Sequence, residues 1–231
     1  MTDEVAPEPE LGLRERKKRA TRRRISDIAT GLFTMRGFDN VTIADVARAA
    51  DVSVNTVFNY FGTKEDLFFD RQDELVEGVA GELRRRRPGE SVVALFRRRF
   101  IESLDENAYP TGFHEGSEIW AKTVMDSAAL MAKQEEFGRS SRRRLAEALA
   151  EETGADPDDI TPRVVAAMVH AAQWELVGDI VGRKMAGQTL HEMRDTVYAN
   201  AHRVFDLLER GIGDYAVKPP DTGARDAASG K

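Results

Sequence analysis

Apolar residues recur along most of the chain at intervals of three and four, which is the spacing of one face of an α-helix. The first such stretch predicts a helix from about Arg14 to Arg36, ended by Gly37. Its shared apolar face consists of Ile25, Ile28, Ala29, Leu32 and Phe33. No alternation of period two is long enough to predict a strand, and the sequence has no internal repeat. We therefore expect an all-α protein.

Two hydroxyl residues indicate where the next helices begin. Thr42 is followed three residues later by Asp45, and Thr63 is followed in the same way by Asp66. This is the capping-box pattern with aspartate in place of glutamate, and it predicts helices that begin near residues 43 and 64. Ser53 can cap a further short helix between them. Residues 50–53 then join two short helices by a turn of the length found in helix-turn-helix motifs.

The predicted helix at residues 54–61 has one apolar and one polar face at about 100° per residue. Val57 and Phe61 point inward, and Asn55 and Asn59 point in the opposite direction. An exposed asparagine can form two hydrogen bonds to adenine in the major groove, a contact worth about 1–3 kcal/mol of discrimination. Asp51 stands at the turn position that usually needs a left-handed backbone, which aspartate adopts more readily than most residues. The pattern predicts a helix that reads DNA.

Charge is unevenly distributed along the 231 residues, although the formal net charge is only -6. Residues 14–24 contain eight cations and one anion, a net charge of +7, so the remaining residues carry -13. Such a segment can neutralise DNA phosphates. An isolated basic run can equally be a solvated tail, so this one supports DNA binding only together with the motif that follows it.

The stretch from residue 14 to about residue 75 resembles the TetR family of transcriptional regulators. The elements that carry the resemblance are Gly37-Phe38, Val41-Thr42-Ile43-Ala44-Asp45-Val46-Ala47, Val52-Ser53, Thr56-Val57-Phe58-Asn59-Tyr60-Phe61 and Lys64-Glu65-Asp66-Leu67. The resemblance implies an N-terminal three-helix helix-turn-helix DNA-binding domain at residues 14–66. It also implies a larger helical domain for effector binding and dimerisation, with about nine helices, at residues 67–214.

The same resemblance implies which side chains contact DNA. Phosphate contacts are implied for Thr42, Thr56, Tyr60 and Lys64, and base contacts for Val54, Asn55 and Asn59. Arg48, Ser53 and Phe58 complete the predicted DNA-binding set. Taken alone, Phe58 and Tyr60 would be interpreted as core aromatics, and Lys64 as a solvent-facing lysine.

Further apolar periodicity predicts the helices of the body. A fourth helix runs from Lys64 to about Arg87 and ends before Pro88 and Gly89, with its terminal arginines expected in solvent. Helical segments follow around residues 93–104 and from about 117 to 152. Two amphipathic helices, at about 161–183 and 190–213, close the chain.

These last two helices are the candidate dimer interface. The family resemblance implies that they pair with their twins in a four-helix homodimer interface, whereas periodicity alone would equally allow packing within one chain. A twofold dimer places two reading helices in successive major grooves about 34 Å apart. The DNA site is therefore expected to be a near-palindromic operator in double-stranded DNA.

Candidate effector-binding residues combine aromatic or thioether surface with a few polar groups, which suits a largely apolar small molecule. They are Phe113, His114, Trp120, Met125, His170, Gln173 and Trp174. For each of them a place in the hydrophobic core is the competing interpretation. The four histidines show no ligand spacing, and no zinc box, phosphate loop or nucleophile elbow occurs in the sequence. We therefore expect neither a metal nor a cofactor.

The remaining features concern compartment and chain ends. The sequence has no cysteine, which excludes a disulfide framework and is typical of a cytoplasmic protein. No run of about 18 uncharged apolar residues indicates a membrane span. Residues 1–13 and 215–231 are poor in apolar residues and are expected to be disordered tails.

Together the sequence predicts a repressor that binds a palindromic operator as a homodimer and is released by a small-molecule effector. The alternative is an activating or architectural DNA-binding protein without an effector. A helical enzyme is a third interpretation, but no acid–base pair at productive spacing can be identified in the sequence, so we expect no catalysis.

Overall fold

The computed structural model describes residues 12–70, 81–84 and 86–219. Within these ranges the ordered elements are helices and no strand occurs, which confirms the predicted all-α class. In chain order they are α1 (Leu13–Arg36), α2 (Ile43–Ala49), α3 (Val54–Tyr60), α4 (Lys64–Phe68), α6 (Val92–Asp105), the 3-10 helix η1 (Tyr109–Thr111), α7 (Ser117–Met125), α8 (Ala128–Thr153), α9 (Thr161–Met185) and α10 (Leu190–Ile212). The predicted tails at residues 1–11 and 220–231 lie outside the described residues, as does the part of the predicted fourth helix at residues 71–80.

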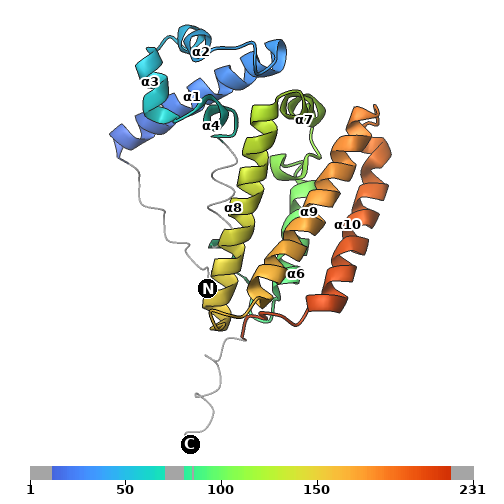
Figure 1. Cartoon of the computed structure of the whole chain (residues 1–231). Helices are drawn as coiled ribbons and strands as arrows, with labels where there is room; N and C mark the ends of the chain where they lie inside the picture. The colour runs from blue at the N-terminus through green and yellow to red at the C-terminus, as the bar shows by residue number, and fades with distance from the viewer. Residues whose placement is uncertain (1–11, 71–80, 85, 220–231) are drawn as a thin grey trace, which may run out of the picture.

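The first four helices form a head at one end of the molecule (Figure 1). Its core includes Ile25, Phe33, Val46, Val57 and Leu67, all of them fully buried. Burying one such side chain stabilises the fold by about 1.5–3 kcal/mol. Because α2, α3 and α4 are only 7, 7 and 5 residues long, this packing rather than helix propensity holds them in place.

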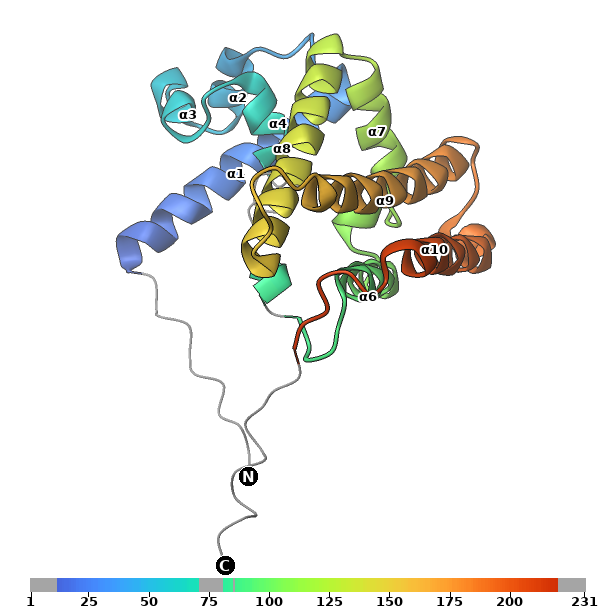
Figure 2. The ribbon, with the colours of Figure 1, turned by 60° about the horizontal axis from the view of Figure 1, so that its bottom comes forward.

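The body is a bundle of long helices that lies beside the head and makes up the rest of the molecule (Figures 1 and 2). α9 packs against both α8 and α10, and α10 packs against α6. Their shared core includes Leu104, Phe113, Leu149, Val169 and Phe205. α8 extends from this bundle to the head, where its Leu130 belongs to the head's own core. The two units are therefore joined by side-chain packing as well as by the chain.

The segment expected as one long helical stretch from about residue 117 to 152 is divided between α7 and α8. Ser127 lies at the division, is buried, and donates a hydrogen bond from its hydroxyl to Asp39 Oδ1 at 3.0 Å. Asp39 belongs to the head, 88 positions earlier in the chain. The break between α7 and α8 thus coincides with a long-range polar contact, which cannot be predicted from the neighbouring residues in the sequence.

Arg86 corrects the expectation that the arginines at residues 84–87 remain in solvent. Its side chain is fully buried, donates to the carbonyls of Leu83 and Ala216, and forms an ion pair with Glu152. Residues 215–218, which were predicted to belong to a disordered tail, are ordered. Lys218 N donates to the carbonyl of Glu90 at 3.1 Å, and the Lys218 carbonyl accepts from Gly89 N at 2.8 Å.

Candidate functional site

The turn between α2 and α3 has the geometry that the sequence predicts. The Thr42 hydroxyl accepts from Asp45 N at 3.2 Å and Asp45 Oδ2 accepts from Thr42 N at 3.0 Å, so the capping box is complete. The Thr42 hydroxyl, which donates to Asp45 Oδ2 at 2.6 Å, and the Thr42 N–H hold the pKa of Asp45 below its usual range. Ser53 Oγ accepts from Thr56 N at 3.0 Å and caps α3. Asp51 has a φ of 50°, the left-handed conformation expected at this position.

Asp51→Gly is expected to stabilise the protein by about 0.5–1 kcal/mol, because glycine adopts the left-handed conformation without the clash of a Cβ atom. The Asp51 side chain is exposed, so no buried contact is lost. Urea unfolding of the wild type, Asp51→Gly and Asp51→Ala measures the effect. Asp51→Ala should destabilise the protein. A higher free energy of unfolding for Asp51→Ala than for Asp51→Gly contradicts the account.

One side of α3 faces solvent. Asn55 and Asn59 are exposed, as predicted, whereas Val57 and Phe61 are buried in the head. Phe58 is 50% exposed, which rules out the interpretation of this ring as a core aromatic. Tyr60 is half-buried. α3 therefore presents two amides and an aromatic ring outward from a rigid support.

The other predicted DNA-binding side chains border this face. Thr42, Arg48, Ser53 and Val54 are exposed, and Thr56 is half-buried with its hydroxyl 2.8 Å from that of Ser53. Arg48 forms an ion pair with Asp45 at 3.1 Å. Lys64 is half-buried, and its ammonium lies 4.1 Å from the centre of the Phe38 ring, a cation–π contact.

The basic run at residues 14–24 lies on α1, and one of its arginines has a structural role that the sequence did not reveal. Arg22 pairs with Asp70 at 2.6 Å and donates to the carbonyl of Tyr60 at 3.0 Å. Arg22 therefore fixes α1 to the end of α3. The neighbouring cations Lys17, Lys18 and Arg23 are exposed. This arrangement places a basic surface beside α3.

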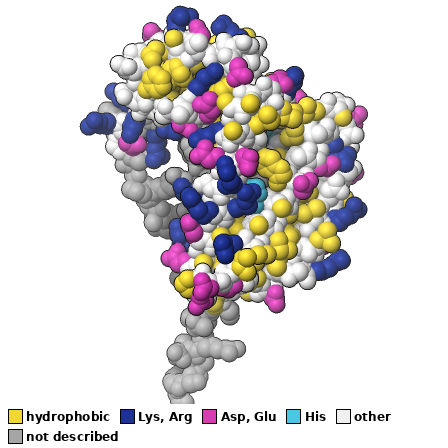
Figure 3. Space-filling model, viewed as in Figure 1, with side chains coloured by type: hydrophobic (Ala, Val, Ile, Leu, Met, Phe, Trp, Pro, Cys, Tyr) yellow, Lys and Arg dark blue, Asp and Glu magenta, His cyan; other side chains and the backbone are white. Residues whose placement is uncertain are grey.

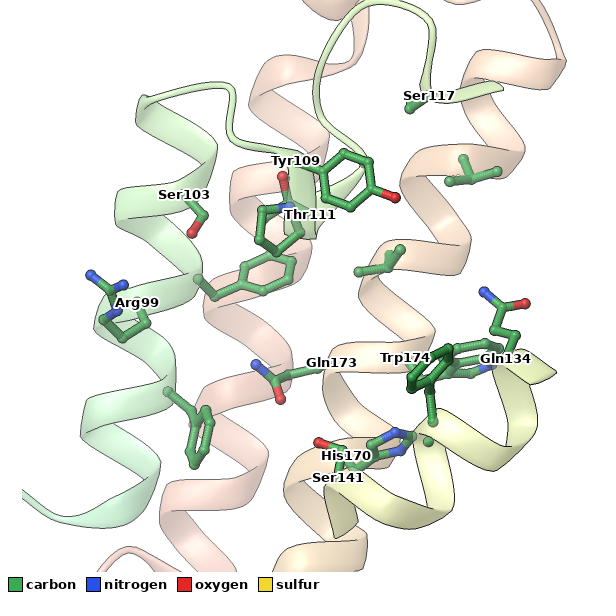
Figure 4. Close-up of a pocket in the computed structure, with 18 of the residues that line it drawn as sticks. Arg99, Ser103, Tyr109, Thr111, Ser117, Gln134, Ser141, His170, Gln173 and Trp174 are labelled. Carbon is green, nitrogen blue, oxygen red and sulfur yellow. The ribbon is translucent and has the colours of Figure 1, made fainter. Parts of the chain in front are cut away.

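A cavity of about 550 Å³ lies in the body between α6, η1, α7, α8 and α9 (Figure 4). Its size is that of a site for a drug-sized molecule. Five of the seven predicted effector residues line it: His114, Trp120, His170, Gln173 and Trp174. The other two do not. Phe113 is fully buried in the core of the body, and Met125 is 48% exposed at the end of α7.

Sequence reasoning missed several lining residues on α6, η1 and α8. They include Phe96, Arg99, Phe100, Ser103, Tyr109, Gln134, Phe137, Gly138 and Ser141. A signal for part of this set was present, because Gln134, Gly138 and Ser141 recur at the i, i+4, i+7 spacing of one helical face. Small and uncharged polar residues on a face turned toward the protein interior are typical of a ligand site.

Trp120 connects the cavity with the head. It lines the cavity and also stacks on Phe68 of α4, with ring centres 5.6 Å apart and an angle of 21° between the rings. Phe137, another lining residue, packs against Phe69 with ring centres 5.2 Å apart. Side chains of the cavity wall therefore touch the core of the head directly.

An ion pair on the same side reinforces this junction. Lys133 of α8 lies 3.0 Å from Asp66 of α4. Burial raises the pKa of Asp66, but the hydrogen bonds from Lys133 and Thr63 outweigh this effect and leave the pKa below its usual range. The carboxylate is therefore charged at neutral pH and keeps α4 attached to α8.

These observations define a helix-turn-helix DNA-binding regulator with a helical body that contains a ligand-sized cavity. Residues 25–70 match the family model described as bacterial regulatory proteins, tetR family, and residues 120–212 match the MftR C-terminal domain. The chain belongs to the TetR family of transcriptional regulators.

Relatives and solved structures agree with this assignment. The chain is 28% identical over 179 residues to the transcriptional regulator TcmR of Streptomyces glaucescens, covering 75% of this chain and 76% of TcmR. GusR of Salmonella enterica has a similar fold, with a TM-score of 0.53 and 17% identity over 83% of this chain and 94% of GusR. SmeT in complex with triclosan also has a TM-score of 0.53, with 18% identity over 83% of this chain and 90% of SmeT. The relatives are regulators rather than enzymes, as predicted.

Proposed function

We propose that the chain is a repressor that binds a near-palindromic operator as a homodimer and is released by a small-molecule effector. The observation that carries the proposal is the position of Trp120, which lines the cavity and stacks on the head that contains the reading helix. This position favours an effector-controlled regulator over an architectural DNA-binding protein. SmeT, which shares the fold, is described as a complex with triclosan. The protein acts in the cytoplasm, where the chromosome of a bacterium lies.

In this proposal the exposed face of α3 enters the major groove. Asn55 and Asn59 read base edges, with Val54 in apolar contact and Arg48 and Phe58 at the edge of the contact. Thr42, Ser53, Thr56, Tyr60 and Lys64 fix the head on the phosphates. Both amides are exposed and no described side chain occupies their hydrogen-bonding groups, which supports this role.

The homodimer is supported by α9. This helix is long and apolar enough to cross a membrane by length and composition alone, with a mean hydropathy of 1.3 over 18 residues, of which 33% are buried within the chain. Because α9 packs between α8 and α10, its apolar residues are explained by helix packing and do not require a membrane. Val164, Ala167, Met168 and Ala171 are exposed on one side of α9, and the space-filling view shows a hydrophobic patch along the bundle (Figure 3). A second copy would cover this surface.

Ala171→Glu is expected to raise the dissociation constant of the dimer by on the order of 100-fold or more, because the carboxylate would be buried without a partner. Operator affinity should fall with it. Analytical ultracentrifugation measures the change. Ala129→Glu is the control, since it adds the same charge to an exposed position in the first turn of α8. A dimer that is unaffected by Ala171→Glu contradicts an interface on α9.

The salt dependence of DNA binding tests the proposed function. A protein that neutralises six or more phosphates loses on the order of 10³-fold in affinity or more between 50 and 200 mM salt. Fluorescence anisotropy with a labelled duplex should show this decline, and a sequence-specific duplex should bind more tightly than a scrambled one. Binding that is indifferent to salt and sequence contradicts the proposal.

A further inference from the structure

The walls of the cavity are unusually rich in flat rings. Phe96 and Phe100 contribute from α6, Tyr109 from η1, Phe137 from α8 and Trp174 from α9, in addition to Trp120 from α7. Trp174 also stacks on His170, with an angle of 12° between the rings. Aromatic rings prefer offset or edge-to-face contact with other rings, which contributes beyond the area buried. Flat surfaces from five elements therefore favour a rigid planar ligand over a flexible chain.

Charged groups at the cavity already have partners. Arg99 pairs with Glu82 and with Glu102, each at 3.2 Å. Behind the wall, the buried Lys184 pairs with Glu118 at 2.7 Å. A cationic ligand would find no carboxylate without breaking one of these pairs, and its desolvation would remain uncompensated.

His170 adds no charge of its own at neutral pH. Burial lowers the pKa of His170, and the positive charge of Arg142 lowers it further. Since the ordinary value is 6.5 and the shift is downward, the ring is neutral at pH 7 and above. A neutral imidazole offers one hydrogen-bond donor and one acceptor.

Several uncharged polar side chains of the wall have no hydrogen-bond partner among the described residues. Ser117 is only 4% exposed, and its hydroxyl has no hydrogen-bond partner among the described residues. Gln134, Ser141 and Gln173 also line the cavity without a side-chain partner in that part of the chain. Figure 4 shows Gln173 pointing into the cavity and Ser141 lying beside His170. A buried hydroxyl without a partner costs free energy unless a ligand satisfies it.

We infer that the effector is a planar, aromatic molecule without positive charge that carries carbonyl or hydroxyl groups. The inference rests on the proposed function, because it concerns the ligand of the same cavity. The rings of the wall contact the ligand rings, and Ser117, Gln173 and the neutral His170 hydrogen-bond its oxygen atoms. A cationic drug is excluded by the lack of an unpaired carboxylate among the described lining residues, since Glu82 is held by Arg99.

Three probes with one ring system and different charges test this ligand class. They are 2-(hydroxymethyl)anthraquinone, which is neutral, anthraquinone-2-carboxylate, an anion, and 2-(aminomethyl)anthraquinone, a cation. Trp120 and Trp174 are the two tryptophans of the chain and both line the cavity, so quenching of intrinsic fluorescence reports binding there. Calorimetry provides the affinity independently. The neutral probe should bind at least 10-fold more tightly than the cationic probe. It should quench the fluorescence of both tryptophans, which the Trp120→Phe and Trp174→Phe variants report one at a time.

Gly138 provides a variant that reduces the space without adding a charge. A Cβ atom at this position would lie 3.3 Å from His170 Nε2, whereas one at Gly211 of α10 would meet no heavy atom within 4 Å. Gly138→Ala should weaken binding of the neutral probe about 10-fold, and Gly211→Ala should leave it unchanged. Both variants gain the same helix propensity.

Binding of the cation as tight as that of the neutral probe overturns the inference, as does an unchanged affinity of the neutral probe in Gly138→Ala. Failure of all three probes to bind also overturns it. DNA binding is measured on the same samples by anisotropy. Intact DNA binding without probe binding rejects the ligand class alone, whereas loss of sequence-specific DNA binding by the wild type rejects the proposed function.

Discussion

Asn59→Ala is expected to weaken binding to the specific operator by about 1–3 kcal/mol per half-site, on the order of 10- to 100-fold for each, and to leave binding to unrelated DNA almost unchanged. The side chain is exposed on α3, opposite the buried Val57, so its removal costs no packing. What is lost is a base contact on each half of the operator. Anisotropy titrations with specific and scrambled duplexes at one salt concentration measure both affinities.

Asn40→Ala is the matched control for this experiment. Asn40 lies in the same head, between α1 and α2, and its amide donates to the carbonyl of Arg36 at 3.0 Å. Loss of that hydrogen bond should lower the stability of the head without removing a contact with bases. An equal loss of specific affinity in both variants, or none in Asn59→Ala, argues against base reading by α3.

Phe68→Leu is expected to separate ligand binding from DNA release. Phe68 does not belong to the cavity wall, but it stacks on Trp120, which does. Leucine fills most of the space and removes the ring contact, so the variant should bind the ligand normally. The factor by which the ligand lowers operator affinity should fall about 10-fold, within the usual range of coupling free energies. The measurement compares operator affinity with and without a compound that releases the wild type.

Phe33→Leu serves as the control for Phe68→Leu. Phe33 packs in the same core against Phe38 and Phe68, and its ring does not stack on Trp120. Both variants should lose a similar amount of stability, and Phe33→Leu alone should keep the full response to the ligand. If Phe68→Leu responds like the wild type, the connection through Trp120 is not the route of coupling.

The head formed by the first four helices was largely predictable from the sequence, because the residues that determine its structure are close together in the chain. Thr42 and Asp45 cap the same helix that they start, and Asp51 adopts its left-handed backbone within the turn itself. The alternation of Asn55, Val57 and Asn59 around one short helix is also a property of adjacent residues. Such features require no knowledge of the rest of the fold.

The features that escaped prediction depend on residues far apart in the chain. The boundary of α8 coincides with the contact between Ser127 and Asp39, and Arg86 is buried because residues 152 and 216 supply its partners. Phe113 and Met125 have the composition of cavity residues, yet only the packing of helices decides that one enters the core and the other faces solvent. Helical periodicity gives the direction of a side chain on its helix but not the neighbour that it meets.

Selection of bound sequences from randomised duplexes, followed by measurement of the stoichiometry on the selected site, tests the central claim most directly. Two copies of α3 held by a twofold dimer require an inverted repeat whose half-sites are centred about 10 base pairs, or a multiple of one helical turn, apart. We predict such a repeat, with protomers bound in pairs. A single asymmetric site occupied by one protomer would contradict the account.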